Sequence, residues 1–308
     1  MSAASASLGE FQSAAATDTG LLRDHNEDRY FIDGGRGLFL VVDGVGGHAA
    51  GELAAQTAVE TIREFLTGPG SFTGGSPAAP EQRVRDAIAA ANNRIFEIAA
   101  HDAAHKGMAC VLTLAIVADG QITIGHVGDS RLYLIWNGAI RKLTSDHSPV
   151  GQDEDAGELT EQEAMRHPRR NEVFRDVGTA LRAAGDEGFI EVRRSSFHRD
   201  AALLLCSDGL TDHLNAARVR EVVERYDGDP ARVANDLVEA ANHAGGRDNI
   251  TAVFVAGPEF RGRSGATRPR TGTTRIRVPR GAFTGRAAFL VYGLLIGMLI
   301  WLAMRVLG

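Results

Sequence analysis

Four aspartates stand next to apolar runs that are typical of buried β-strands. Asp43 ends "LFLVVD", Asp208 ends "LLLCSD", Asp129 ends "ITIGHVGD" and Asp248 immediately precedes "NITAVFV". A single aspartate at a strand end is often only a turn residue. Four of them, in a chain whose interior cannot hold unpaired charges, favour convergence at one end of a sheet.

Convergent carboxylates repel one another unless a cation lies between them. The nearby segments offer few lysines but many oxygen ligands, and oxygen ligands without a His/Cys cluster select Mg²⁺ or Mn²⁺ over Zn²⁺. The sequence therefore predicts a site for two divalent ions. Glycines flank Asp43 in "LFLVVDGVGGHAAGE", which would let the Gly44 carbonyl approach a metal and let water or substrate enter.

Arg23 lies upstream in "RDHNEDR", just ahead of the first expected strand. It is either an ordinary surface residue or, beside a metal–carboxylate cluster, a guanidinium that clamps a phosphate with two hydrogen bonds. The second interpretation predicts a phosphorylated substrate.

The elements that would position these residues follow from the periodicity of the sequence. Apolar residues at helical intervals predict helices at 52–66, 81–100, 216–225 and 230–243. Runs rich in β-branched residues, joined by glycine-containing turns, predict strands within 30–44, 110–143, 188–209 and 249–257. A polar stretch at 144–186, with a short helix at 160–166, resembles a mobile flap. Strands in consecutive hairpins and helices in pairs predict an α+β fold of antiparallel sheet covered by helices.

The composition is that of a globular protein in a reducing compartment. At 308 residues, 44% of them apolar and 23% charged, the chain is long enough to bury a large core. Cys110 and Cys206 sit in apolar runs without ligand-like spacing, which argues against disulfides and thiolate metal sites. From Glu259 onward nine arginines accompany one glutamate, so the overall charge of −6 leaves −14 on residues 1–258. An acidic body of this kind does not indicate nucleic-acid binding.

The C-terminal region has the pattern of a basic linker followed by a membrane anchor. Residues 259–286 are rich in Gly, Thr, Pro and Arg, which predicts a flexible segment. Residues 287–304 carry no charge and would form a helix of about 27 Å, close to the hydrocarbon thickness of a lipid bilayer. We expect a transmembrane helix at 287–305 rather than a buried core helix. Four arginines precede it, so the positive-inside bias places the large domain in the cytoplasm, on the inner membrane.

The N-terminus lacks the basic start and the long apolar core of a signal peptide. Residues 1–11 are expected to be disordered, and the folded domain is expected to begin at residue 12.

Seven short motifs occur in the order found in a known family: "RDHNEDR", "LFLVVDGVGGHAAGE", "GHVGDSRLYL", "LTSDHS", "HPRRNEVFRDVG", "LLLCSDGL" and "GGRDNITAVFV". Over residues 12–256 the chain closely resembles the metal-dependent serine/threonine protein phosphatases of the 2C type (the PPM family), in their bacterial form. The resemblance implies a domain over 12–258 that is a four-layer αββα sandwich, in which helix pairs flank two antiparallel sheets. The metals would lie in a cleft at one end.

The resemblance also implies roles for the strand-end residues. Asp43 would bridge two metals, Asp208 and Asp248 would complete the first, and the Gly44 carbonyl would serve the second. Asp129 matches the residue that, together with Asp208, holds a third ion in bacterial members.

Three upstream residues receive roles from the same match. Glu27 and Asp28 would hold metal-bound waters, and Arg23 would bind the phosphate. Two metals would lower the pKa of a water between them, which would attack phosphorus in line. No phospho-enzyme is expected, because neither cysteine is followed by an arginine six positions on and no D-x-D-x-[TV] motif is present.

The chain departs from the family pattern at two places. Residues 109–111 are Ala-Cys-Val where Gly-Thr-Thr is frequent, and Val45 stands where eukaryotic members have a catalytic-acid histidine. Bacterial relatives also lack that histidine. His48 is a candidate substitute proton donor, although an ordinary loop residue is the simpler interpretation. His126, inside an apolar strand, is expected to be a hydrogen-bonded core histidine.

Three functions are compatible with these residues. An active phosphatase is favoured because every metal-ligand position is filled. A membrane-tethered, phosphoprotein-binding pseudophosphatase would keep the fold but would usually lose an aspartate. A metal-dependent hydrolase of small phosphoesters would share the same ligands. For the phosphatase, the expected substrates are phosphorylated proteins, and the expected partners are membrane-associated serine/threonine kinases or their targets.

Overall fold

Two five-stranded antiparallel sheets lie face to face in the computed structural model, which describes residues 11–47, 49–68 and 79–263. The first sheet has the strand order β1 (Gln12–Asp18), β10 (Ile250–Ala256), β9 (Ala202–Cys206), β6 (Arg131–Trp136) and β7 (Ala139–Lys142). The second has the order β2 (Arg29–Asp33), β3 (Leu38–Val45), β4 (Ala109–Ala118), β5 (Gln121–Val127) and β8 (Glu191–Ser196). Neighbouring strands are antiparallel throughout, as the hairpin pattern predicts.

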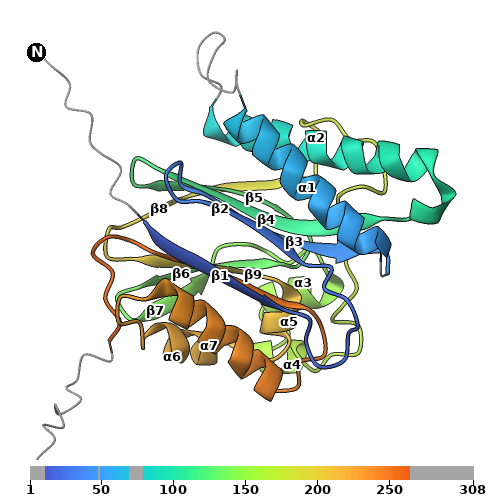
Figure 1. Ribbon diagram of the computed structural model, residues 1–308. Coiled ribbons are helices and arrows are strands. Elements are labelled where there is room, and N and C mark those ends of the chain that lie inside the picture. Colours follow the sequence, from blue (N-terminus) through green and yellow to red (C-terminus); the bar gives the residue numbers. More distant parts are fainter. Residues whose placement is uncertain (1–10, 48, 69–78, 264–308) are drawn as a thin grey trace, which may run out of the picture. The chain divides into compact units, whose positions relative to one another are not determined.

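Paired helices cover the outer faces of both sheets (Figure 1). α1 (Ala49–Thr67) and α2 (Pro80–His101) lie on the second sheet, and α6 (Ala216–Val223) and α7 (Pro230–His243) lie on the first. The remaining helices are short: the 3₁₀ turn η1 (Ala103–His105), α3 (Pro149–Asp155), α4 (Glu161–Ala164) and α5 (Asp208–Thr211). The predicted α+β fold, a four-layer αββα sandwich, is therefore confirmed for the described residues.

Strand β3 shows why the central strands are apolar at every position. Leu38, Leu40 and Val42 pack with the helices α1 and α2, whereas Phe39 and Val41 pack between the two sheets. Alternate side chains point to opposite faces of a strand, so a strand covered on both faces needs apolar residues throughout. Burial contributes about 1.5–3 kcal/mol for each large side chain, and this packing fixes the end of β3 in space.

Four described elements, β1, η1, α3 and α5, have no counterpart in the sequence prediction, and β1 and α3 show why. β1 has the sequence QSAAATD, whose small residues show no strand periodicity, and it forms because it pairs with β10 over its whole length. α3 lies inside the polar stretch at 144–186. Its start is fixed locally, because the Ser148 hydroxyl accepts a hydrogen bond from the Gly151 amide and Pro149 opens the first turn.

Some sequence predictions concern residues outside the described part of the chain. These are the disorder of residues 1–10, the proton donor His48, and the linker and transmembrane helix beyond residue 263. Among the helices that the structure does describe, none combines the length and the apolar character needed to cross a bilayer.

The packed region reaches slightly beyond both expected domain boundaries. Phe11 lies edge-on against Phe39 and Phe197. At the other end, Phe260 is buried and packs against Tyr226 and Phe254. The hydrophobic core therefore includes residues from Phe11 to Phe260.

Candidate active site

The registers of the strands bring the predicted acidic residues to one end of the sandwich. In an antiparallel pair, the start of one strand lies beside the end of the next. Arg29 of β2 pairs with Val42 of β3, so Asp28 lies beside Asp43. By the same rule, the pairing of β9 with β10 places Asp208, which follows β9, next to the start of β10.

Asp129 joins this group through the second sheet. β4 lies between β3 and β5, and it pairs Val111 with Asp43 on one side and Leu112 with Val127 on the other. Asp129 lies two residues beyond the end of β5, so it lies at the same end of the sandwich as Asp43.

These residues surround a cleft of about 200 Å³. Its lining includes seven of the predicted site residues: Arg23, Glu27, Asp43, Gly44, Asp129, Asp208 and Asp248. Asp28 is 1% exposed and lies behind this lining. Of the predicted site residues, only His48 lies outside the described residues.

The carboxylates in the cleft repel one another strongly. Burial, followed by the charges of Asp28 and Asp208, raises the pKa of Asp43 well above its usual value. Burial and then Asp129 do the same to the pKa of Asp208. Burial raises the pKa of Asp28 to about 6 and, together with Asp146, the pKa of Asp129 to about 7. At neutral pH such a cluster needs a compensating positive charge.

The oxygen atoms of the cluster fit a divalent cation. Oδ1 of Asp28 and Oδ1 of Asp208 are buried, and within the described part of the chain neither accepts a hydrogen bond. A buried carboxylate oxygen without a partner is costly, and coordination to a cation would satisfy it. An all-oxygen set of carboxylates and one carbonyl matches the preference of Mg²⁺ and Mn²⁺.

Arg23 provides positive charge at the mouth of the cleft. Its Nη2 lies 2.6 Å from Oδ2 of Asp248, and its side chain is half exposed. The guanidinium therefore contacts the acidic cluster on one side and solvent on the other, which is the position from which it would meet an anionic group entering the cleft.

Two buried polar residues that the sequence analysis did not single out hold this arrangement together. The Ser207 hydroxyl donates to Oδ2 of Asp28 at 2.7 Å and accepts from the Thr251 amide at 2.9 Å. Asn249 accepts from the Glu27 amide through Oδ1 at 2.8 Å, and its Nδ2 donates to the carbonyls of Thr19 and His25. The sequence carried one signal for both residues: Ser207 directly precedes the predicted site residue Asp208, and Asn249 directly follows Asp248.

Gly44 and Gly51, in the glycine-rich segment that follows Asp43, have a packing role in addition to the predicted one of giving metal, water or substrate access. A Cβ on Gly44 would overlap the carbonyl oxygen of Gly51, and a Cβ on Gly51 would overlap the carboxylate of Glu27. The end of β3, the start of α1 and the Glu27 loop are therefore in backbone contact. Only glycine permits this approach.

The polar stretch at 144–186 forms one wall of the cleft through Asn171 and Val173. This wall is fixed at both ends. Nε of Arg170 donates to Oδ2 of Asp212 at 2.8 Å, and the Phe174 amide donates to the carbonyl of His147 at 2.9 Å.

His126, His147 and Glu191 form a second cluster with metal-ligand spacing, with ligand atoms within 4.8 Å of one another. The histidine nitrogens are already engaged. His126 contacts the Thr113 hydroxyl and the Ser145 carbonyl, and Nδ1 of His147 accepts from the Gly128 amide. Burial and the neighbouring His147 lower the pKa of His126 to about 4, which keeps it neutral. The predicted core histidine is confirmed, and the cluster is a structural network.

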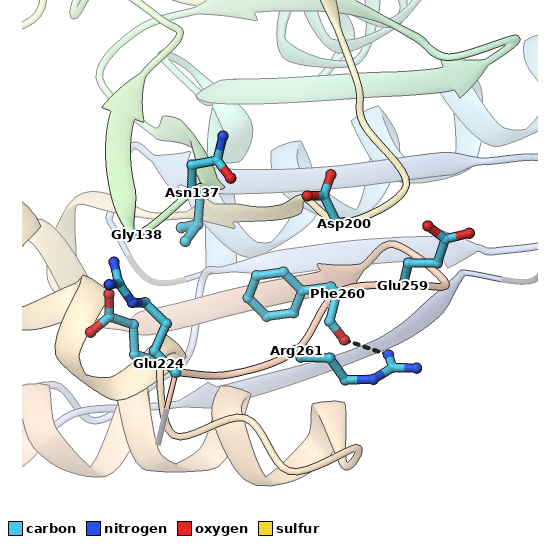
Figure 2. Close-up of a pocket in the computed structure, with 9 residues that line it drawn as sticks. Asn137, Gly138, Asp200, Glu224, Glu259, Phe260 and Arg261 are labelled. Atoms are coloured by element: carbon cyan, nitrogen blue, oxygen red, sulfur yellow. Dashed lines mark hydrogen bonds between the residues drawn. The ribbon is translucent and has the colours of Figure 1, made fainter. Parts of the chain in front are cut away.

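A larger cavity, of about 390 Å³, lies beside the turn between β6 and β7 (Figure 2). Its carboxylates are paired with donors rather than with each other. Asp200 accepts from Trp136 Nε1 at 2.9 Å, and Glu259 accepts from Arg199 Nε at 2.6 Å. The cavity therefore lacks the concentration of negative charge that marks a metal site.

Comparison with known proteins gives a consistent result. The family model described as Protein phosphatase 2C matches residues 23–240. The chain is 35% identical to "Serine/threonine phosphatase stp" of Listeria monocytogenes over 244 residues, which are 78% of this chain and 93% of that protein.

Solved structures show the same similarity. The structure of the serine/threonine phosphatase Stp1 from Staphylococcus aureus matches with a TM-score of 0.70 and 30% identity, covering 83% of this chain and 99% of that one. The catalytic domain of the serine/threonine protein phosphatase PstP, solved in complex with two manganese ions, matches with a TM-score of 0.67 and 28% identity over 80% and 97%.

Proposed function

The chain belongs to the protein phosphatase 2C family and is a metal-dependent serine/threonine protein phosphatase, and we propose that its acidic cleft holds two Mn²⁺ or Mg²⁺ ions that act in hydrolysing phosphoserine and phosphothreonine. The observation that carries the proposal is the convergence of buried carboxylates, two of which have oxygens without a hydrogen-bond partner in the described chain. The manganese-bound relative supports the same assignment.

We assign the ligands by their places in the cleft and by the family pattern. By the family pattern, Asp43 would serve both ions, Asp208 and Asp248 would hold the first, and the Gly44 carbonyl would hold the second. Asp129 and Asp208 together offer a place for a third.

The remaining groups act on water and phosphate. Glu27 and Asp28 would hold waters at the ions, and Arg23 would bind the phosphate at the mouth. When bound, the ions would acidify a water and offset the negative charge that develops on the phosphoryl oxygens. The carboxylates must lose protons before they bind an ion, because burial and mutual repulsion raise their pKa. His48 remains a candidate proton donor to the leaving group.

The direct test is phosphate release from a phosphothreonine peptide by the full chain. We expect release with Mn²⁺ or Mg²⁺ and none with EDTA. Peptide binding without release under both metals would instead indicate a pseudophosphatase. Hydrolysis of small phosphoesters alone would indicate the third alternative.

Ser207→Ala is expected to weaken Mn²⁺ binding about 10- to 100-fold, the usual effect of removing a residue that orients a ligand. The Ser207 hydroxyl holds Oδ2 of Asp28, and without it the carboxylate, whose Oδ1 has no hydrogen-bond partner among the described residues, loses its fixed orientation. Isothermal titration calorimetry measures the affinity. Ser195→Ala is the control, because that hydroxyl bonds Arg141 away from the cleft. Equal affinities in the two folded variants would contradict the positioning role.

We also propose that residues 287–305 anchor the enzyme in the inner membrane, with the catalytic domain in the cytoplasm. The support is the uncharged run at 287–304 and the arginines that precede it. Anchoring would raise the local concentration of the enzyme near membrane-associated serine/threonine kinases or their targets. Deleting residues 287–308 should move the protein from the membrane fraction to the soluble fraction. A full chain that is already soluble would refute the anchor.

A further inference from the structure

Exposed apolar side chains gather around the mouth of the cleft. Among the described residues, seven large apolar side chains are exposed, and four of these either line the cleft or lie within two residues of its lining in the sequence: Leu21, Leu22, Val45 and Phe174. Leu22 directly precedes Arg23, Val45 itself lines the cleft, and Phe174 directly follows the lining residue Val173. We call these four residues the apolar collar. Exposed apolar groups gathered beside a polar site are typical of an interaction surface.

The Phe174 side of the collar is held in a fixed position. The Phe174 amide donates to the carbonyl of His147, and its ring lies 6.2 Å from the imidazole of the same residue. The guanidinium carbon of Arg175 lies 5.7 Å from the centre of the ring. The aromatic ring is nevertheless 46% exposed. A fixed aromatic side chain that still faces solvent loses little conformational entropy when it binds a ligand.

The part of the collar formed by Leu21 and Leu22 is fixed through the backbone. The Leu21 amide donates to the Gly246 carbonyl at 2.6 Å, and Arg23 is paired with Asp248. Leu22 lies between these two attachment points and is 71% exposed. The collar therefore has apolar groups on the loop that carries the proposed phosphate-binding arginine and on the wall formed by residues 171–174.

We propose that the apolar collar binds large apolar side chains next to the phosphorylated residue, so that the enzyme prefers phosphoprotein segments with apolar flanking residues. The proposal rests on the proposed phosphatase function and names its substrate class. In an extended peptide each residue advances about 3.3 Å and successive side chains point to opposite sides. The side chains two positions before and two positions after the phosphorylated residue would therefore face the enzyme together with it and reach the collar. Partial burial of one or two such side chains is expected to favour the substrate about tenfold.

The test compares two phosphothreonine peptides of equal length and charge. One has leucine or phenylalanine at the two positions on each side of the phosphothreonine, and the other has serine there. We expect kcat/KM with Mn²⁺ to be about tenfold higher for the apolar peptide. In Leu22→Ala and Phe174→Ala this ratio should fall toward one, through loss of activity on the apolar peptide. Phe65→Ala, which removes a similarly exposed ring from α1, should keep the wild-type ratio.

The possible outcomes separate the collar from the catalytic proposal. Release of phosphate from both peptides at equal rates would leave the phosphatase function intact and overturn the collar. Failure of the wild type to hydrolyse either peptide would refute the phosphatase function itself. If Leu22→Ala and Phe174→Ala keep the peptide preference but lose binding to anionic phospholipid vesicles, the collar contacts a membrane and the proposal is wrong.

Discussion

Asp208→Asn is expected to lower kcat about 1,000-fold or more and to leave the fold intact. The carboxylate is proposed to hold the first ion, and loss of a group that stabilises the charge of the transition state costs on this scale. Asparagine keeps the shape of the side chain and removes the carboxylate charge. Burial and the charge of Asp129 raise the pKa of the Asp208 carboxyl. Phosphate release measures turnover, circular dichroism measures the fold, and calorimetry measures Mn²⁺ binding.

Asp200→Asn serves as the control for this variant. Asp200 lines the larger cavity, away from the acidic cluster, and accepts a hydrogen bond from Trp136. The Asp200→Asn variant should keep wild-type turnover and Mn²⁺ affinity. Retained activity in Asp208→Asn would remove Asp208 from the site.

Asp43→Asn is expected to stabilise the metal-free protein at pH 7.5 by about 1–3 kcal/mol and to abolish the stabilisation by Mn²⁺. A buried charge among like charges destabilises a fold unless it is compensated, and asparagine removes that charge. Burial and then Asp28 and Asp208 raise the pKa of Asp43 in the folded state. Denaturant unfolding in EDTA and in excess Mn²⁺ gives the free energy of unfolding for both proteins. A metal-free variant less stable than the wild type would contradict this prediction.

The same cluster predicts the pH dependence of the metal-free wild type. A carboxyl whose pKa is raised in the folded state binds its proton more tightly when the protein is folded. Its contribution to the free energy of unfolding is therefore complete below the unfolded-state pKa of about 3.9 and is lost as pH rises. With folded-state values of about 6 for Asp28 and about 7 for Asp129, this loss falls between about pH 4 and pH 7. Mn²⁺ should therefore add more stability at pH 7.5 than at pH 5. Asp43→Asn should lose less stability over this range, and equal slopes for the two proteins would argue against coupled carboxylates.

The sequence by itself determined the class of fold and pointed to the acidic residues that line the cleft. Asp43 and Asp208 were recognisable because each directly follows an apolar run, and strand, turn and carboxylate are then local to a few residues. The paired helices were recognisable for the same reason, since helical periodicity is read within one segment. The metal preference followed from the kind of atoms alone, because carboxylate and carbonyl oxygens favour Mg²⁺ and Mn²⁺ wherever they meet.

The tertiary structure decided what depends on residues far apart in the chain. The Arg23–Asp248 ion pair links the loop after β1 to the start of β10, and the bond from Ser207 to Asp28 links the two sheets; neither partner carries a local signal of the other. β1 forms only because β10 offers it a partner, since its own small residues show no strand pattern. Phe174 reaches the mouth of the cleft because contacts with His147 hold it there. Short-range periodicity encodes elements and their end residues, whereas register and packing between elements decide which of those ends meet.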